Sequence, residues 1–315
     1  MRLAISTSAF VLAAALSLPL AACAPEAKEA PVAEAPAVPA IAAFTAGADV
    51  HAFTIGGWQA AAVRDGGGEF PNDNKTLAIN KTKADVDALL TANGLPTETL
   101  SLSIQPLVVR TADKVMLFDT GAAASFGPGA GKLPASLQAA GDDAGAITDI
   151  YISHGHGDHI LGLVTADGAL AFPNAAVHIS SPQWAAMQAD TTIAALVTAV
   201  TPKVATFEPG ADIVPGVKGV DIQGHTPGHS GYLITSGDQS VLFIGDTMHH
   251  SVISVQQPDW TIAFDGDAPT AQASRNKLLA DSAASGQRIF APHFPFPGIG
   301  KFEKKDDHFV WVAEQ

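Results

Sequence analysis

The most informative stretch of this chain is Ser153-His154-Gly155-His156-Gly157-Asp158-His159, in which three imidazoles and a carboxylate stand close together. Buried polar side chains cost free energy unless they find partners, so an ordinary hydrophobic core does not account for this density. Imidazole nitrogens and carboxylate oxygens are standard ligands of Zn²⁺ and similar ions. The motif therefore predicts a metal centre.

The spacing of these side chains favours two ions over one. His154 and His156 are separated by one residue and can point to the same side of an extended chain, whereas Asp158 and His159 must point elsewhere. The preceding segment, 147–152, is apolar and predicts a buried strand. The ligands would then lie where a strand ends in a loop, the usual place for a site in an α/β protein.

Length and charge narrow the class of protein. The chain has 315 residues, of which 47% are hydrophobic, and this suits one large domain or two small ones. Its formal net charge of −14 and the lack of a basic patch argue against nucleic acid as a partner. We expect a small-molecule substrate instead.

The first 23 residues predict an export signal. A short positive segment and an apolar run end in Leu20-Ala21-Ala22-Cys23, which resembles the bacterial lipoprotein signal with Cys23 as the lipidated residue. The alternative is a plain secretory signal cleaved near Ala22. Either alternative predicts an exported protein, periplasmic or membrane-anchored, that meets the membrane only through a lipid on Cys23.

Composition divides the rest of the chain into a tether and a domain. Residues 24–43 are rich in Ala, Pro and Glu and lack periodicity, which predicts a flexible tether. A single folded domain is expected over 44–315. Within it, apolar runs alternate with amphipathic segments, which predicts α/β layers. The expected strands are 100–110, 115–118, 147–153, 175–180, 220–223, 232–235, 241–244 and 288–291, and the expected helices are 133–140, 182–189 and 270–284.

Three further candidate ligands each follow an apolar, strand-like segment. They are His229 in a turn rich in Pro and Gly, Asp246 after Val241–Gly245, and His293 after Ile289–Pro292. Each alone has an ordinary interpretation, such as a surface histidine or a helix cap. Together with the first cluster, they favour metal binding.

The combined pattern of His-x-His-x-Asp-His, a later His, Gly-Asp and a final His resembles the metallo-β-lactamase superfamily. The resemblance implies a four-layer αβ/βα sandwich. It implies that His154, His156 and His229 hold one ion, that Asp158, His159 and His293 hold the other, and that Asp246 bridges both.

Three stretches resemble methyl parathion hydrolases, which are exported dinuclear enzymes related to quorum-sensing lactonases and arylesterases. They are 119–128, 224–230 and 293–300. The resemblance implies a possible homodimer, and the bridging Asp246 argues against β-lactam hydrolysis. Gly155 and Gly157 depart from the family pattern, which commonly has a bulkier residue and a proline, and we expect them to make the loop less rigid.

The expected cofactors are two divalent metal ions, with Zn²⁺ as the first candidate. Two ions about 3.5–4 Å apart would share a bridging hydroxide that attacks a lactone or an aryl or alkyl ester, with Asp158 and Asp246 as catalytic ligands. The alternatives are an organophosphate triesterase and a non-catalytic metal-binding lipoprotein of the same fold.

Supporting residues are also expected around the metal centre. Asp119 would orient a ligating imidazole, or else cap the turn that follows it. Phe126, Trp184 and His249 would line the substrate pocket. Trp184 lies on a predicted helix and also suits the core, while His249 and its neighbour His250 also suit a polar loop.

Overall fold

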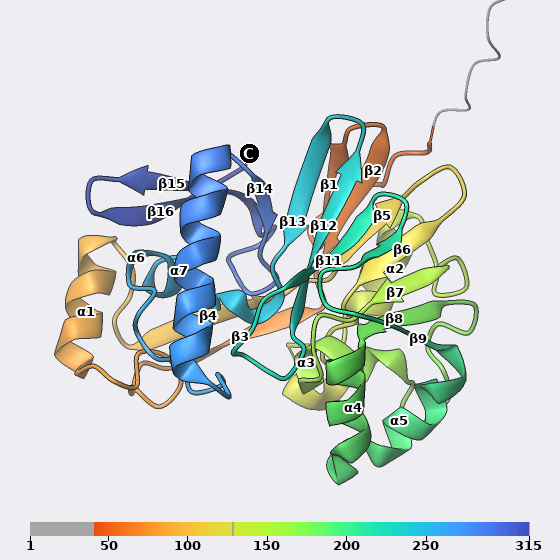
Figure 1. Cartoon of the computed structure of the whole chain (residues 1–315), viewed down its shortest axis with the longest axis horizontal. Coiled ribbons are helices and arrows are strands. Elements are labelled where there is room, and N and C mark those ends of the chain that lie inside the picture. Colours follow the sequence, from red (N-terminus) through yellow and green to blue (C-terminus); the bar gives the residue numbers. More distant parts are fainter. Residues whose placement is uncertain (1–40, 128, 315) are drawn as a thin grey trace, which may run out of the picture. The chain divides into compact units, whose positions relative to one another are not determined.

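The computed structural model describes residues 41–127 and 129–314, whose backbone forms two seven-stranded sheets (Figure 1). The predicted signal segment 1–23 and residues 24–40 of the predicted tether lie outside the described residues. The order of the first sheet is β1 (Val50–Ile55), β2 (Trp58–Val63), β5 (Leu107–Arg110), β6 (Val115–Phe118), β7 (Asp149–Tyr151), β8 (Ala176–Ser180) and β9 (Val204–Phe207). The order of the second sheet is β10 (Asp212–Val214), β11 (Val217–Asp221), β12 (Ser230–Ser236), β13 (Gln239–Phe243), β14 (Arg288–Phe290), β15 (Ile299–Lys305) and β16 (His308–Ala313).

The two sheets pack face to face because alternate residues of each strand point to opposite faces. In β2, Ala60 and Ala62 belong to the core between the sheets, while Ala61 and Val63 belong to the core on the outer face. Aromatic rings fill the core between the sheets, among them Phe118, Tyr232 and Phe243.

Helices cover the outer faces of both sheets. The outer core of the first sheet takes side chains from α2 (Leu133–Ala140), α4 (Ser181–Ala189) and α5 (Ala194–Val200). The outer core of the second sheet takes Leu278 and Leu279 from α7 (Ala268–Ser285), the long helix in front of that sheet in Figure 1. These layers confirm the predicted four-layer αβ/βα sandwich.

The predicted helices are confirmed as α2, α4 and α7, but the predicted strand 100–110 is divided. Its first half, β4 (Thr99–Ile104), pairs only with β3 (Gly66–Pro71) in a separate ribbon, and its second half is β5. Pro106 has no N–H to continue a ladder, and Gln105 is bonded through its side chain to the carbonyls of Ala291 and Phe294.

No element was predicted before Leu100 or after Ala291, yet the structure forms several there. They are β1 to β3, the helix α1 (Lys83–Ala92), and the β15–β16 hairpin. Two short helices, α3 (Gly157–Ile160) and α6 (Ile253–Gln256), complete the α-helices in the described part of the chain, beside several 3-10 turns. No helix among the described residues has the length and apolar character needed to cross a membrane.

Candidate metal centre

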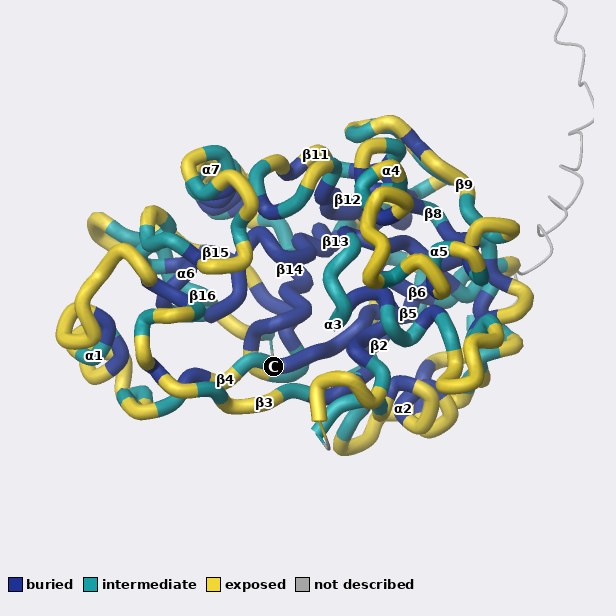
Figure 2. The backbone as a smooth tube through the Cα atoms, turned by 90° about the horizontal axis from the view of Figure 1, so that it is seen from below, coloured by how far each residue is buried: buried dark blue, intermediate teal, exposed yellow. Residues whose placement is uncertain are grey.

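The candidate ligands come together where strands of both sheets end. Strands β6, β7 and β8 run parallel in the first sheet, and β13 and β14 run parallel in the second. The loop after β7 carries the opening motif and continues into α3, while Asp246 and His293 follow β13 and β14. Figure 2 shows α3 in the central part of the fold, and His159 of α3 lies 3.2 Å from His293, Nε2 to Nε2. The carboxyl ends of parallel strands are the usual edge for a site.

The side chains form two groups, each with its ligand atoms within 4.8 Å of one another. The first group is His154, His156, His225 and Asp246, and the second group is Asp158, His159 and His293. Asp246 reaches both groups. Its Oδ2 lies 3.3 Å from Nε2 of His225, and its Oδ1 lies 2.9 Å from Nε2 of His293.

The prediction that His229 is a ligand is wrong, and His225 takes its place. Both ring nitrogens of His229 are already engaged, since Nδ1 lies 3.0 Å from the carbonyl of Ile222 and Nε2 accepts the N–H of Asp246 at 2.9 Å. Gly245 permits this approach, because a Cβ there would lie 2.6 Å from Nε2 of His229. His229 therefore supports the backbone of Asp246 from behind. Both histidines belong to one turn, and nothing in their spacing distinguishes the ligand.

The hydrogen bonds around the imidazoles leave lone pairs facing one another. Nδ1 of His293 lies 2.8 Å from the carbonyl of Ser103, and Nδ1 of His159 lies 2.7 Å from the carboxylate of Asp119. Each Nδ1 must carry the proton to donate to these oxygens, so each neutral ring has its lone pair on Nε2. The two Nε2 atoms then repel unless a positive charge lies beside them. Oδ1 of Asp246 is buried without a hydrogen-bond partner among residues 41–127 and 129–314, and it too calls for a positive charge nearby.

The pKa values agree with a cation site. Burial lowers the pKa of His154 well below its usual range and lowers the pKa of His156 to about 4, so both rings are neutral at pH 7. Burial alone would raise the pKa of Asp246, but the neighbouring imidazoles, His159 first, hold it well below its usual range. Burial alone would lower the pKa values of His159 and His293, but Asp246 and Asp158 beside them raise both. Imidazoles thus surround a permanent negative charge that attracts protons or cations. This donor set fits divalent ions such as Zn²⁺.

Asp119 lies behind both groups of ligands. Its Oδ2 is 2.7 Å from Nδ1 of His159, and its two oxygens accept from the backbone N–H and the hydroxyl of Ser153, each at 2.7 Å. The Ser153 hydroxyl lies 3.0 Å from Nδ1 of His154. One carboxylate therefore orients a ligand in the second group directly and a ligand in the first group through Ser153.

A cavity of about 560 Å³ opens onto the two groups. Asp158, Asp246, His249 and His293 are among its polar lining residues. Its walls are mostly apolar, with Phe70, Leu102, Ile104, Phe126 and Phe264 among the lining residues. Phe126 and Phe264 are 56% and 46% exposed, so apolar surface remains available to a ligand.

Two of the three predicted pocket residues line the cavity, and the third does not. His249 lines the cavity with Phe126, and its Nε2 is 3.1 Å from Oδ2 of Asp246. Trp184 does not line the cavity: it packs against the outer core of the first sheet, which corrects the prediction. His250 is buried, and its Nδ1 accepts from the backbone N–H groups of Val252 and Ile253 at the start of α6.

Gly155 serves close packing in the motif loop. A Cβ at Gly155 would lie 2.9 Å from side-chain atoms of both Gln183 and Met187, because α4 packs directly against the loop. Beside the lower rigidity of the loop, which stays a prediction, Gly155 thus has a packing role. A small residue lets α4 approach the ligands.

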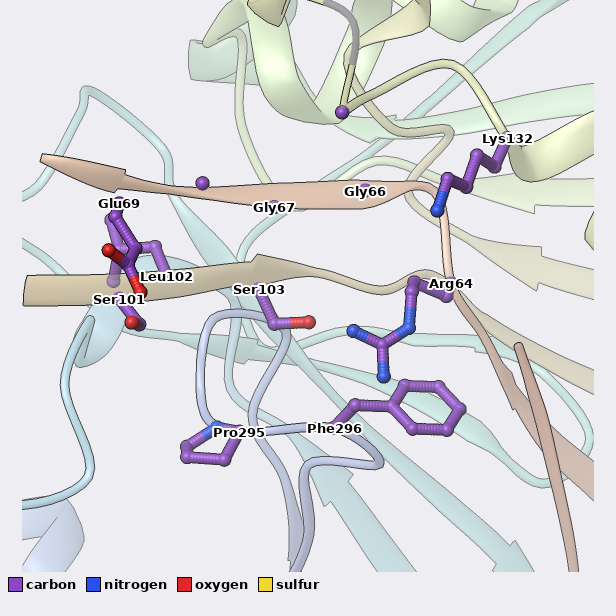
Figure 3. Close-up of a pocket in the computed structure, with 12 residues that line it drawn as sticks. Arg64, Gly66, Gly67, Glu69, Ser101, Leu102, Ser103, Lys132, Pro295 and Phe296 are labelled. Atoms are coloured by element: carbon purple, nitrogen blue, oxygen red, sulfur yellow. The ribbon is translucent and has the colours of Figure 1, made fainter. Parts of the chain in front are cut away.

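A second cleft, of about 490 Å³, lies beside the β3–β4 ribbon (Figure 3). Arg64, Lys132, Ser103 and Phe296 line it, and none of the candidate ligands does. Arg64 is already paired with Asp49 at 3.1 Å, and its guanidinium lies over the ring of Phe296, 4.2 Å from the centroid. The metal centre belongs to the first cavity alone.

Comparisons with known proteins agree with this geometry. A family model described as the metallo-beta-lactamase superfamily matches residues 103–293. No curated protein matches the chain. Among solved structures, AidC, a dizinc quorum-quenching lactonase in complex with a product, is 30% identical with a TM-score of 0.79, covering 84% of this chain and 97% of its own.

Two other solved structures are similar over most of the chain. Hydrolase AbOPH is 28% identical with a TM-score of 0.77, covering 86% of this chain and 99% of its own. A probable metal-dependent hydrolase from Staphylococcus aureus is 17% identical with a TM-score of 0.70, covering 84% and 99%, and this likeness concerns the fold alone.

Proposed function

This chain belongs to the metallo-beta-lactamase superfamily, and from that premise we propose that it is a dinuclear hydrolase that opens lactones or cleaves aryl and alkyl esters. The observation that carries the proposal is the position of the apolar cavity, which opens onto both groups of ligands. An ester carbonyl can lie against the ligands while an acyl chain or aryl ring occupies the apolar wall.

The metal ions would supply an activated water near neutral pH and polarise the ester carbonyl. The chain's own residues supply the rest. Asp246, with an oxygen toward each group, would hold the two ions at a fixed separation. Asp158 lines the cavity, and its side chain is 18% exposed. It can therefore accept the proton that the attacking water releases and pass it to the leaving group.

The cavity walls indicate substrates with an apolar part. Phe126 and Phe264 supply aromatic surface at the cavity, and β3 contributes Gly67 and Gly68, which add no side chain. AidC, the lactonase named above, was solved with an N-acyl homoserine product. We therefore place N-acyl homoserine lactones and aryl esters first among the substrates to test.

A substrate panel tests the proposal directly. The full chain, loaded with Zn²⁺ or Co²⁺, is assayed on an N-acyl homoserine lactone, an aryl ester and methyl parathion. We expect both carboxylic esters to be hydrolysed faster than the phosphotriester. A faster phosphotriester rate would assign the protein as an organophosphate triesterase. Two bound ions without hydrolysis of any of the three would indicate a metal-binding protein.

We also propose export, with a lipid on Cys23 as the membrane anchor. Cys23 lies outside the described residues, so the proposal rests on the sequence motif. Metabolic labelling with palmitate should label the wild type but not Cys23→Ser, and labelling of both would contradict the anchor. A homodimer stays a prediction, to be checked by light scattering.

A further inference from the structure

A buried aspartate and arginine lie behind the first group of ligands. Arg275 of α7 is 0% exposed and among the largest fully buried side chains. Its Nη2 donates to Oδ2 of Asp265 at 2.8 Å, and Oδ1 of Asp265 lies 3.0 Å from Nδ1 of His225. The carboxylate therefore joins the guanidinium to a candidate metal ligand.

The remaining hydrogen bonds of Arg275 go to backbone carbonyls, one of them next to a second member of the same group. Its Nε donates to the carbonyl of Thr247, which directly follows Asp246, and its Nη1 donates to the carbonyl of Pro258, both at 2.8 Å. One side chain thus fixes the segment beside Asp246 and the carboxylate behind His225.

The backbone of the same region fixes the His225 loop. The N–H of Gly266 donates to the carbonyl of His225 at 3.0 Å, and that of Asp267 donates to the carbonyl of Gly224 at 2.8 Å. Gly224 lies so close to α7 that a Cβ there would be 2.1 Å from the backbone nitrogen of Ala271. The position of His225 therefore depends on the start of α7.

Stability alone is a weak reason for this arrangement. Burying an ion pair costs desolvation energy that its attraction often fails to recover, so well-packed apolar residues would stabilise the fold as well. Orientation is a stronger reason. A carboxylate that accepts from Nδ1 fixes the tautomer of His225 and directs its Nε2 lone pair at the metal group.

We propose that Asp265 and Arg275 are positioning residues that set the affinity of the ion held by His154, His156, His225 and Asp246. The inference rests on the proposed function in one respect, namely that divalent ions bind at the two groups. It concerns the first group selectively, because His159 and His293 of the second group are oriented by Asp119 and the carbonyl of Ser103.

Asp265→Asn in the full chain tests the inference. The substitution keeps the shape of the side chain, but asparagine has one acceptor oxygen in place of two. It can accept from His225 or from Arg275 but not from both, and its uncharged oxygen is the weaker partner. Binding of Co²⁺ is measured by competition with a chelator and by visible absorption. We expect the affinity for one of the two ions to fall about 10–100-fold, with a change in its absorption bands, while the other ion is unaffected.

Asp149→Asn is the matched control. Asp149 is also a buried carboxylate bonded to a histidine and a cation, with Nε2 of His178 at 2.9 Å and Nζ of Lys114 at 2.8 Å. It begins β7, whereas the metal ligands follow the other end of that strand. We expect lower stability in this variant, with both Co²⁺ affinities and the spectrum unchanged.

A double variant keeps the inference testable if Asp265→Asn fails to fold. Adding Arg275→Met removes the buried charge left without a partner, and the pair is then judged by circular dichroism and by Co²⁺ binding. A folded single or double variant with wild-type affinities and spectrum would overturn the inference. Wild-type chain that binds no ion would overturn it together with the proposed function, whereas two bound ions without ester hydrolysis would refute the proposed function only.

Discussion

Substituting His225 and His229 separately distinguishes the ligand from its neighbour in the same turn. In His225→Ala the first group loses one of its four members, and its ion loses a nitrogen directed at it. Removing a residue that merely orients a ligand already costs about 10–100-fold in affinity. We therefore expect a loss of at least about 100-fold, and one bound ion in place of two after dialysis.

His229→Ala should act on stability. The backbone N–H of Asp246 and the carbonyl of Ile222 would each lose a buried partner, at about 1–3 kcal/mol apiece. Burial lowers the pKa of His229 to about 3, so the lost ring is neutral at pH 7 and no charge effect is added. The expected destabilisation of about 2–6 kcal/mol is a large part of a typical 5–15 kcal/mol.

The assay combines metal analysis with urea unfolding of the metal-free chain. His229→Asn is the control, because its amide can replace Nδ1 as the donor to Ile222 and should recover part of the stability. The reasoning would be refuted if His229→Ala lost an ion while His225→Ala kept both.

Three further predictions follow from particular contacts. Asp119→Ala should lower the affinity for both ions by about 10–100-fold, because Asp119 orients His159 directly and His154 through Ser153; loss of a single ion, measured by chelator competition, would contradict this. Gly68 lines the cavity, and a Cβ there meets no described atom within 4 Å, so Gly68→Val is accommodated but fills space beside the apolar wall. The variant should raise KM for a decanoyl lactone more than for a butanoyl lactone. An equal effect on both lactones would show that the acyl chain lies elsewhere. Burial lowers the pKa of His250 to about 4, below the value of about 6.5 in the unfolded chain, so the folded state favours the neutral ring. The contribution of neutral His250 to the unfolding free energy is therefore present above pH 6.5 and is lost as pH falls from 6.5 to 4, by on the order of 3 kcal/mol. In His250→Asn the unfolding free energy of the metal-free protein should depend less on pH over that range.

Much of the fold could be read from the chain because its signals are local. Continuous apolar runs such as Val241–Ile244 specify strands with two buried faces. The pair Ser181–Pro182 marks the start of α4, although the cap is one residue earlier, where the hydroxyl of Ser180 accepts from the N–H of Gln183. Strand β3 was missed for the opposite reason. Three glycines in β3 leave no hydrophobic alternation, and only pairing with β4 makes the segment a strand.

The sequence by itself determined the ligand chemistry and most of its positions. His154, His156, Asp158 and His159 are close in the chain, so their grouping needs only a loop after a strand, and Asp246 and His293 follow strands of their own. The tertiary structure alone decided between His225 and His229. Both ring nitrogens of His229 are bonded, to Ile222 and to the N–H of Asp246, whereas His225 is bonded to Asp265 through Nδ1 and keeps Nε2 for an ion. Only packing brings these partners together. The role of Arg275 could not be predicted from the sequence for the same reason. Its partners Thr247, Pro258 and Asp265 surround it only in the folded chain.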